Sequence, residues 1–480
     1  MTVVARWRRW LPRGGSLRSE TADRLVLIAL ALVALKFANF QEISPTIPGR
    51  AALYANDALE LCCYLAFVVL IALSCRSVLP DWIRRRHPGR ILVLSPVVLL
   101  VVGGFVLASI VNSLPGDSQR IDDANAMAVC GAQAITKGQD PYQVNEIACL
   151  RQLGLSVTLA TPLRVGPFAG VDTYPSAARI KAAARSAGSA GSTANVFSGL
   201  AKPPLDPVSM IPVASMSSQM RSLWTLLAAA IFAVLLGVAA GSLWAAALAA
   251  FLATYFIPGS ALNFASFGNA ESVAYLLMAA SVLWIRRPVL SAVCLGLAVG
   301  SNELALFFLP AYLLLCLALD GKLRRLVALV ATLALAVVPL LVAYPDAIST
   351  IWRNLAAPTF PLGYGPVVLI LQGVIKPLPS DLFLAATAAA MALIVFWGRL
   401  RPSWRVSAGV LTLAAFWLSW RSLDEYMAQV PLLAVVAILA LLAGRDLRSE
   451  PLGSSQEVAD APRVTADVSP YRRATPDGQM

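Results

Sequence analysis

Residues 288–343 read PVLSAVCLGLAVGSNELALFFLPAYLLLCLALDGKLRRLVALVATLALAVVPLLVA, and this stretch decides the fold. It contains three apolar runs, interrupted by the polar Asn302–Glu303 pair and by the basic segment GKLRR at 321–325. A helix of about 20 apolar residues is long enough to cross about 30 Å of hydrocarbon. The stretch therefore predicts a succession of membrane-spanning helices.

The composition of the whole chain agrees with this interpretation. Hydrophobic residues make up 58% of 480 and charged residues 13%, and the mean hydropathy is +0.72. A soluble domain carries about a quarter charged residues. We expect an all-α polytopic membrane protein with about 12 transmembrane helices. The apolar runs lie at 23–40, 55–75, 91–113, 222–240, 242–258, 268–285, 288–301, 303–319, 323–343, 381–397, 405–420 and 428–444.

The positive charges indicate the orientation of these helices. The net charge of +12 comes largely from short basic connectors, among them 83–90, 321–325 and 398–405. Basic loops stay on the cytoplasmic side of a membrane, so this pattern predicts topology rather than nucleic-acid binding. With the N-terminus inside, the pattern holds if segment 364–379 is a short re-entrant or interfacial piece. Both termini then lie inside, and the first helix is a retained anchor.

The chain divides into five parts on this basis, of which the third is the most unusual. A polar stretch of this size is rare in a transporter, and we expect it to lie outside the cytoplasm and to carry the chemistry. The parts are a basic cytoplasmic N-terminus at 1–22, three helices at 23–113, an extracytoplasmic loop at 114–221, the remaining helices at 222–444 and a disordered cytoplasmic tail at 445–480.

The loop itself has three sections. IDDANAMAVCGAQAITKGQDPY predicts an amphipathic helix that ends at Gly138, followed by a turn. The middle section, AARIKAAARSAGSAGSTANVFSG, is low in complexity and is predicted to be flexible. KPPLDPVSMIPVASMSSQM is predicted to lie in the membrane interface. Cys130 and Cys149 both fall in the loop, where they either form a disulfide or remain free thiols.

The residues available on the outer face limit its chemistry. The chain has one histidine, in the inner loop IRRRHPGR, so a Ser-His-Asp hydrolase is excluded outside and a zinc site of the usual ligands is not expected. Asp117, Asp122 and Asp123 follow the third helix, where a carboxylate can act as a general base or simply cap a helix. Cations suited to binding a phosphate are Arg120, Lys202, Arg221, Arg353 and Arg421.

Other ionisable and polar residues also map to the outer ends of helices. Charges at such places mark function or merely snorkel to the interface. In VGSNELALFF, the pair Asn302–Glu303 lies between two apolar runs with no basic residue nearby in the sequence. Further candidates are Tyr142, Asp424 and Glu425. No metal is required, although carboxylates within 117–123 could hold a divalent cation.

These features resemble the membrane glycosyltransferases of the C type (the GT-C fold), and in particular bacterial mannosyltransferase-like proteins that use polyprenyl-phosphate mannose. The resemblance rests on the acidic pair with a helix and KGQDPY, on KPPLDPVSMIPVASMSSQMRSLWTLL, and on FGNAESVAYLLMAAS and GLAVGSNELALFFLP in that order. The chain departs from the family in carrying two helices before the loop, in lacking an aromatic residue before the paired prolines, and in having Asn302 and Glu303 where a basic residue is common.

The resemblance implies an inverting transfer of a mannose-like or other sugar from a polyprenyl-phosphate donor to a hydroxyl of a lipid or glycan acceptor. Asp123 or Asp122 matches the family's catalytic aspartate, with Asp117 as the third choice. The enzyme would lie in a bacterial inner membrane with its active site outside. Two alternatives stay open: a transporter or lipid flippase with a charged outer vestibule, and an assembly protein whose loop binds a partner.

Overall fold

The computed structural model describes the chain in thirteen stretches. The predicted spans 91–113 and 242–258 lie outside them, as do His87 and the tail 445–480. The described residues are 19–38, 50–86, 123–164, 168, 170–188, 200, 202–240, 265, 268–356, 362–363, 365–376, 378–422 and 424–442.

The described part of the chain is built almost entirely of helices. Its first half contains α2 (Ser19–Ala38), α3 (Arg50–Ser74), α4 (Asp81–Arg86), α7 (Asp123–Thr136), α8 (Ile147–Gln152), α9 (Thr161–Arg164), α10 (Ala177–Gly188), α11 (Leu205–Met210), η4 (Ile211–Val213) and α12 (Ser218–Ala240). Its second half contains α15 (Glu271–Leu283), α16 (Pro288–Ser301), α17 (Glu303–Cys316), α18 (Lys322–Thr332), η5 (Leu333–Val337), α19 (Val338–Ala343), α20 (Asp346–Ala356), β1 (Leu362–Gly363), α21 (Val367–Leu371), α22 (Ser380–Leu400), η6 (Pro402–Trp404), α23 (Arg405–Leu411), η7 (Thr412–Leu418), β2 (Arg421–Ser422), α24 (Asp424–Ala437) and η8 (Ile438–Leu442).

Three helical stretches in the described residues are long and apolar enough to cross a membrane. They are Asp57–Ser74, Lys322–Ala343 and Ser380–Leu400. Five shorter apolar helices, of 10 to 17 residues, accompany them. Lys322–Ala343 exposes large apolar side chains, with Leu335 80% and Val342 76% exposed. Such a surface suits hydrocarbon rather than water, so the helical membrane class predicted from the sequence agrees with the structure.

The helices α2 and α3 form a pair that is fixed at one end by a buried arginine. The guanidinium of Arg24 donates hydrogen bonds to the carbonyl oxygens of Ser74 at 2.7 Å and Arg76 at 2.6 Å. It also pairs with Glu20 at 2.6 Å. The last carbonyl groups of a helix have no partner within that helix, and a cation there satisfies them and its dipole. Arg24 therefore caps the end of α3 from α2.

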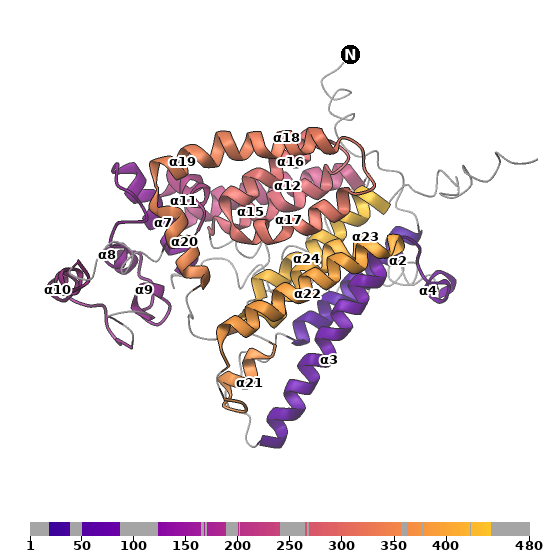
Figure 1. Cartoon of the computed structure of the whole chain (residues 1–480), viewed down its shortest axis with the longest axis horizontal. Coiled ribbons are helices and arrows are strands. Elements are labelled where there is room, and N and C mark those ends of the chain that lie inside the picture. The colour runs from indigo at the N-terminus through magenta and orange to yellow at the C-terminus, as the bar shows by residue number, and fades with distance from the viewer. Residues whose placement is uncertain are drawn as a thin grey trace, which may run out of the picture. The chain divides into compact units, whose positions relative to one another are not determined.

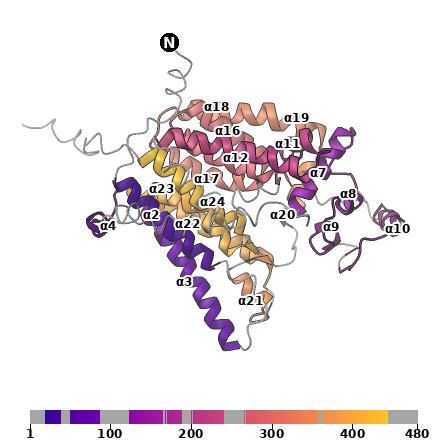
Figure 2. The ribbon, with the colours of Figure 1, turned by 180° about the vertical axis from the view of Figure 1, so that it is seen from behind.

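The middle of the bundle depends on close packing of α16 against its neighbours. In Figures 1 and 2, α12, α15, α16 and α17 run side by side and α18 runs along α16. A Cβ atom at Gly296 would lie 2.8 Å from Thr332 Cγ2, and one at Gly300 would lie 2.7 Å from Val337 Cγ2 and 2.5 Å from Leu205 Cδ1. Two glycines four residues apart let helix backbones approach closely.

Segment 364–379 was predicted to be too short to form a full membrane span. Its helix, α21, has five residues and is too short to cross a membrane, as expected of a re-entrant or interfacial piece. Next to it, β1 and β2 form a parallel pair in which Leu362 is opposite Arg421. The remaining helices, α22 to α24, pack against α3 and α17.

The large loop is more ordered than the sequence suggested. Its first section forms α7, and Gly138 follows with a φ of +71°, as predicted for the end of the helix. The middle section was expected to be flexible, but its first part forms α10. The alanine-, arginine- and lysine-rich sequence of α10 favours a helix, and its Ile180 and Ala183 pack on a small apolar core with α7, α8 and α9.

We expect Gly300→Ala to lower the free energy of unfolding by about 1–3 kcal/mol, because the added methyl group has no space between Leu205 and Val337. Thermal unfolding of the purified protein in detergent measures this. Ala388→Val, which adds methyl groups on the exposed side of α22, is the control and should change little. An unchanged melting temperature in Gly300→Ala would contradict the close packing of α16.

Candidate functional site

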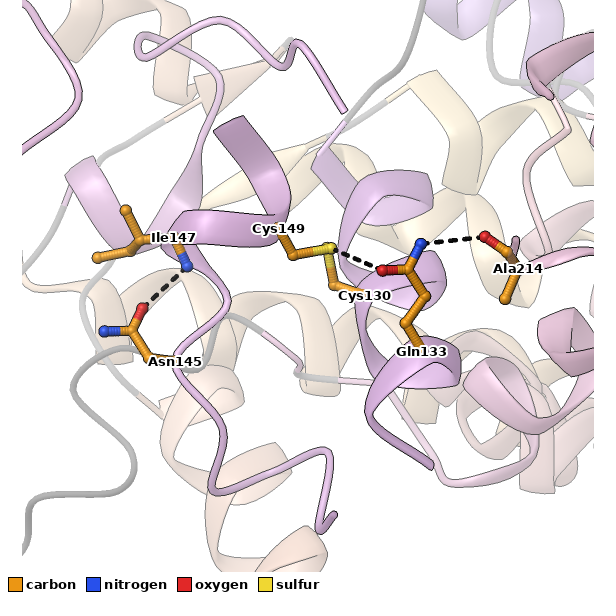
Figure 3. The surroundings of a disulfide bond; sticks show 6 residues. All are labelled: Cys130, Gln133, Asn145, Ile147, Cys149 and Ala214. Carbon is orange, nitrogen blue, oxygen red and sulfur yellow. Dashed lines mark hydrogen bonds between the residues drawn. A yellow bond between two sulfur atoms is a disulfide. The ribbon is translucent and has the colours of Figure 1, made fainter. Parts of the chain in front are cut away.

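A disulfide between Cys130 and Cys149 joins α7 to α8, which settles one question that the sequence left open. Figure 3 shows its surroundings. The amide of Gln133, one turn along α7, donates from Nε2 to the carbonyl oxygen of Ala214 at 3.0 Å. Its Oε1 lies 3.6 Å from the sulfur of Cys149. The cross-linked part of the loop is thereby attached to the segment that leads into α12.

Tyr142, in the turn QDPY, anchors the next part of the loop. Its side chain is fully buried, and its hydroxyl group donates to the carbonyl oxygen of Lys202 at 2.8 Å. Burial raises the pKa of the phenol, so this donor stays protonated. The turn is fixed by Asp140, whose Oδ1 accepts from the Tyr142 N–H at 2.9 Å. Burial also raises the pKa of the Asp140 carboxyl group, and nearby Asp346 adds to this rise.

The side chain of Lys202 lies between two carboxylates from different helices. Its Nζ pairs with Oε1 of Glu303 at 3.0 Å and also with Oε1 of Glu271. The side chain of Lys202 is 11% exposed, that of Glu271 1% and that of Glu303 16%. We call Lys202, Glu271 and Glu303 the triad. Glu303 has no basic neighbour in the sequence, and its partner comes from a residue 101 positions earlier.

The local sequence explains why Glu271 and Glu303 each lie at the first position of a helix. Asn302 caps α17, with its Oδ1 accepting from the Leu304 N–H at 2.8 Å, and Glu303 follows it directly. At the start of α15, Oδ1 of Asn269 accepts from the Glu271 N–H at 2.9 Å. Asn302 is the N-cap of α17, whereas Asn269 lies one residue before Ala270, the N-cap of α15; at both helix starts the helix dipole favours a carboxylate. The ends of α15 and α17 thus each present one carboxylate to the loop.

The triad carries one positive and two negative formal charges in an environment that is largely shielded from solvent. The second oxygen of Glu271 accepts from the hydroxyl group of Tyr275 at 2.8 Å, which disperses part of the excess negative charge. Removing charged groups from water costs several kcal/mol per ion unless partners replace the water. Lys202 therefore holds both glutamates, which do not pair with each other, and through it the loop is held to the bundle.

The helix that begins at Asp123 packs close to the triad. Ala128, Val129 and Ala132 of α7 share an apolar cluster with Ala270, the residue before Glu271. Gly131 of α7 faces Pro207 and Leu200, because a Cβ there would lie 3.1 and 3.2 Å from their side chains. Asp123 itself is half-buried at the start of this helix. The helix of the predicted catalytic aspartate is thus fixed at the end of the bundle where α15 begins.

Arg221 is a second buried cation in this region, and its environment differs from that of Lys202. The residue is 7% exposed and donates from Nη1 to the carbonyl oxygen of Met216 at 2.5 Å. A Cβ at Gly268 would lie 3.0 Å from the Cβ of Arg221, so the start of α12 contacts the turn before Glu271. Within the described residues, Arg221 forms no ion pair with a carboxylate.

A separate polar group lies on α3, where Glu60 is 3% exposed. Its Oε1 accepts from the Gly365 N–H at 2.8 Å. One turn further along α3, the ring of Tyr64 stacks on that of Trp417 with centroids 4.5 Å apart. Glu60 thus joins α3 to the segment that contains β1 and α21, and its bond to a backbone N–H is a structural role.

The other predicted site residues are described to different extents. Asp117, Arg120 and Asp122 lie outside the described residues. For the remaining four, only the backbone is described: Arg353 lies in α20, Arg421 in β2, and Asp424 and Glu425 begin α24. No group of three or more His, Cys, Asp or Glu residues that could hold a metal occurs in the described ranges.

The sequence analysis did not include Glu271, Asn269 or Tyr275 among the candidate site residues. The signal that could have found them is a repeated pattern, because GNAES and SNEL both place an asparagine just before a glutamate at the start of an apolar helix. Known protein families, curated proteins and solved structures were compared with the chain, and none of them matches it.

Replacing Cys130 and Cys149 by serine should lower the stability of the loop by about 3 kcal/mol, the cost expected for opening a cross-link of this size. Limited proteolysis, followed over time, should cut the double variant faster between α7 and α10. Cys62→Ser, which removes a free cysteine, is the control. Labelling of both loop thiols in the untreated, folded protein would show that the disulfide does not form.

Lys202→Met should destabilise the protein by about 3–5 kcal/mol, because it leaves two buried carboxylates without their cation. The triple variant Lys202→Met/Glu271→Gln/Glu303→Gln removes all three charges and should recover most of this loss. Thermal unfolding compares the two with Lys181→Met, on the exposed side of α10. A triple variant no more stable than the single variant would refute the charge compensation.

Proposed function

We propose that the chain is a membrane glycosyltransferase that moves a sugar from a polyprenyl-phosphate donor to the hydroxyl group of a lipid or glycan acceptor. A GT-C-like arrangement of about 12 membrane helices would hold the reaction at the outer face of a bacterial inner membrane. The sugar would be mannose or a related hexose or pentose. This proposal extends the helical membrane class described above to a specific chemistry.

One observation carries the proposal. A single cross-linked loop brings the helix of an acidic residue, Asp123, together with two buried cations, Lys202 and Arg221, at the end of the bundle where α12, α15 and α17 begin. Transfer from a lipid phosphate needs a base for the acceptor and positive charge for the departing phosphate. The residues around this end of the bundle supply both.

In the proposed reaction, the carboxylate of Asp123, or of Asp122 or Asp117, takes the proton of the acceptor hydroxyl group. The acceptor oxygen then attacks C1 of the sugar, and the bond from C1 to the phosphate oxygen breaks. The polyprenyl phosphate leaves with the electron pair of that bond, and the configuration at C1 is inverted. Arg120, Lys202, Arg221, Arg353 and Arg421 remain the candidates for binding the phosphate, with Tyr142, Asn302, Glu303, Asp424 and Glu425 as further site residues.

Within this set, Lys202 and Arg221 differ in what they can offer a phosphate. The charge of Lys202 is already met by Glu271 and Glu303, so Lys202 is better suited to positioning the loop. The disulfide supports the outer location, because such bonds form in oxidising compartments. The expected partners are the donor, the acceptor and the surrounding membrane lipids, with no nucleic acid.

We expect Asp123→Asn to lower sugar transfer from a polyprenyl-phosphate donor about 10²- to 10⁴-fold, the usual effect of losing a general base. Transfer of labelled sugar by purified protein measures this, and Asp122→Asn and Asp117→Asn are assayed beside it. Asp172→Asn, on the exposed surface of the same loop, is the control. Full activity in all three aspartate variants would refute the assignment of the base.

The alternative function is a transporter or lipid flippase, and the excess carboxylate of the triad favours it. A buried site with two carboxylates and one ammonium group can take up a proton or a cation during transport. Substrate flux in proteoliposomes that contain no lipid-linked sugar would support this function. Sugar transfer without flux would exclude it.

A further inference from the structure

We propose that the connectors α15–α16 and α17–α18 together bind the headgroup of an anionic phospholipid, whose acyl chains lie along the exposed face of α18. The cations of this site are Arg286 in the first connector and Lys322 and Arg324 in the first turn of α18. In the predicted topology they lie on the cytoplasmic side of the membrane, opposite the large loop. The inference is therefore independent of the sugar chemistry proposed above.

The first argument is that two connectors distant in the sequence are fixed side by side. The guanidinium of Arg325, which is 5% exposed, donates to the carbonyl oxygen of Ile285 and, at 3.3 Å, to the hydroxyl group of Tyr312. A Cβ atom at Gly321 would lie 3.1 Å from Cγ of Pro288. These contacts hold the start of α18 against the end of α15 and the start of α16. The positive-inside rule places basic residues in connectors but does not require two connectors to meet.

The second argument is the positive charge that this arrangement concentrates. Residues 284–287 and 317–325 contain a single acidic residue, Asp320, against four exposed cations, which are Arg286, Arg287, Lys322 and Arg324. Within the described part of the chain, the side chains of Arg286, Lys322 and Arg324 form no ion pair. Their donors are available to the oxygens of a phosphate group through charge-assisted hydrogen bonds. Basic pockets between membrane helices on the cytoplasmic side suit the headgroups of anionic lipids.

The third argument is the apolar surface that begins at these cations. Leu323, which lies between Lys322 and Arg324, is 73% exposed. Val327 and Val330 are 58% and 55% exposed, and they follow Leu323 at spacings of four and three residues, so the three side chains form one row along α18. A soluble phosphate would use the cations alone. A molecule with a phosphate at one end and acyl chains at the other matches both the cations and the row.

The test uses the full chain in nanodiscs of phosphatidylcholine that contain a low fraction of phosphatidylglycerol with a photoreactive group on its acyl chain. In the wild type, mass spectrometry of the labelled peptides should find the label on α18. Arg286→Gln/Arg324→Gln should lower this labelling about 25-fold, because each cation near a membrane surface strengthens the binding of an anionic lipid about 5-fold.

The matched control is Arg399→Gln/Arg401→Gln, which removes the same charge from exposed arginines of another basic connector. It should leave the labelling of α18 unchanged. Arg286→Lys/Arg324→Lys keeps both charges and should retain most of the labelling. Thermal unfolding in phosphatidylcholine alone should give all three variants the stability of the wild type, because the replaced side chains are exposed.

Three outcomes would overturn the inference. Unchanged labelling in Arg286→Gln/Arg324→Gln would show that these cations do not hold the lipid, and an equal fall in the control would show an effect of overall charge. Labelling of α18 to the same extent by photoreactive phosphatidylcholine would show contact with bulk lipid only. The labelling requires no sugar transfer, so the phospholipid site and the proposed function stand or fall separately.

Discussion

The ion pairing of Lys202 with Glu271 and Glu303 is the interaction on which the attachment of the large loop to the helical bundle depends. It joins the loop to the first turns of two apolar helices through groups that are almost wholly removed from water. The hydrophobic effect is non-directional, so it fixes the position of the loop less specifically than paired charges do. Charges buried together have one favourable geometry, and departure from it exposes each of them to an apolar surrounding.

The loop is attached at several points along its length, and each attachment uses a different kind of contact. The disulfide closes α7 on α8, Tyr142 binds the backbone at Lys202, and Gln133 binds the backbone at Ala214. Small side chains of α7 fill the space against Ala270. Together these contacts attach the described part of the long loop to the bundle at several points, and a fixed position is the condition for placing a reactive group with precision.

Much of the fold was predictable from the sequence, because the rule that governs membrane helices is simple. Apolar runs of the sequence became helices, as at Pro288–Ser301, and the Gly138 stop and the short α21 also followed from local rules. Only three helical stretches of the described residues are long and apolar enough to cross a membrane, so the predicted number of about 12 spans is not confirmed. The site was less predictable. Glu303 was recognised as unusual, but its partner lies 101 residues away, and sequence periodicity carries no information about such a distance. The same holds for the second carboxylate, Glu271. The helix α10 was missed because the low complexity of its segment was interpreted as flexibility, although its alanine, arginine and lysine residues favour a helix.

The order of these contacts along the chain has a consequence for biogenesis. The disulfide closes a segment whose cysteines are 19 residues apart, so it can form before the helices that follow the loop have been synthesised. Lys202, in contrast, has to wait for Glu271, which follows α12 in the chain, and then for Glu303, which follows α12, α15 and α16. During that interval the nascent loop carries a cation without its partners, while its first half is already cross-linked. Folding of the loop would thus begin with the disulfide and end with the ion pairs of Lys202, which form only after α17 has been synthesised.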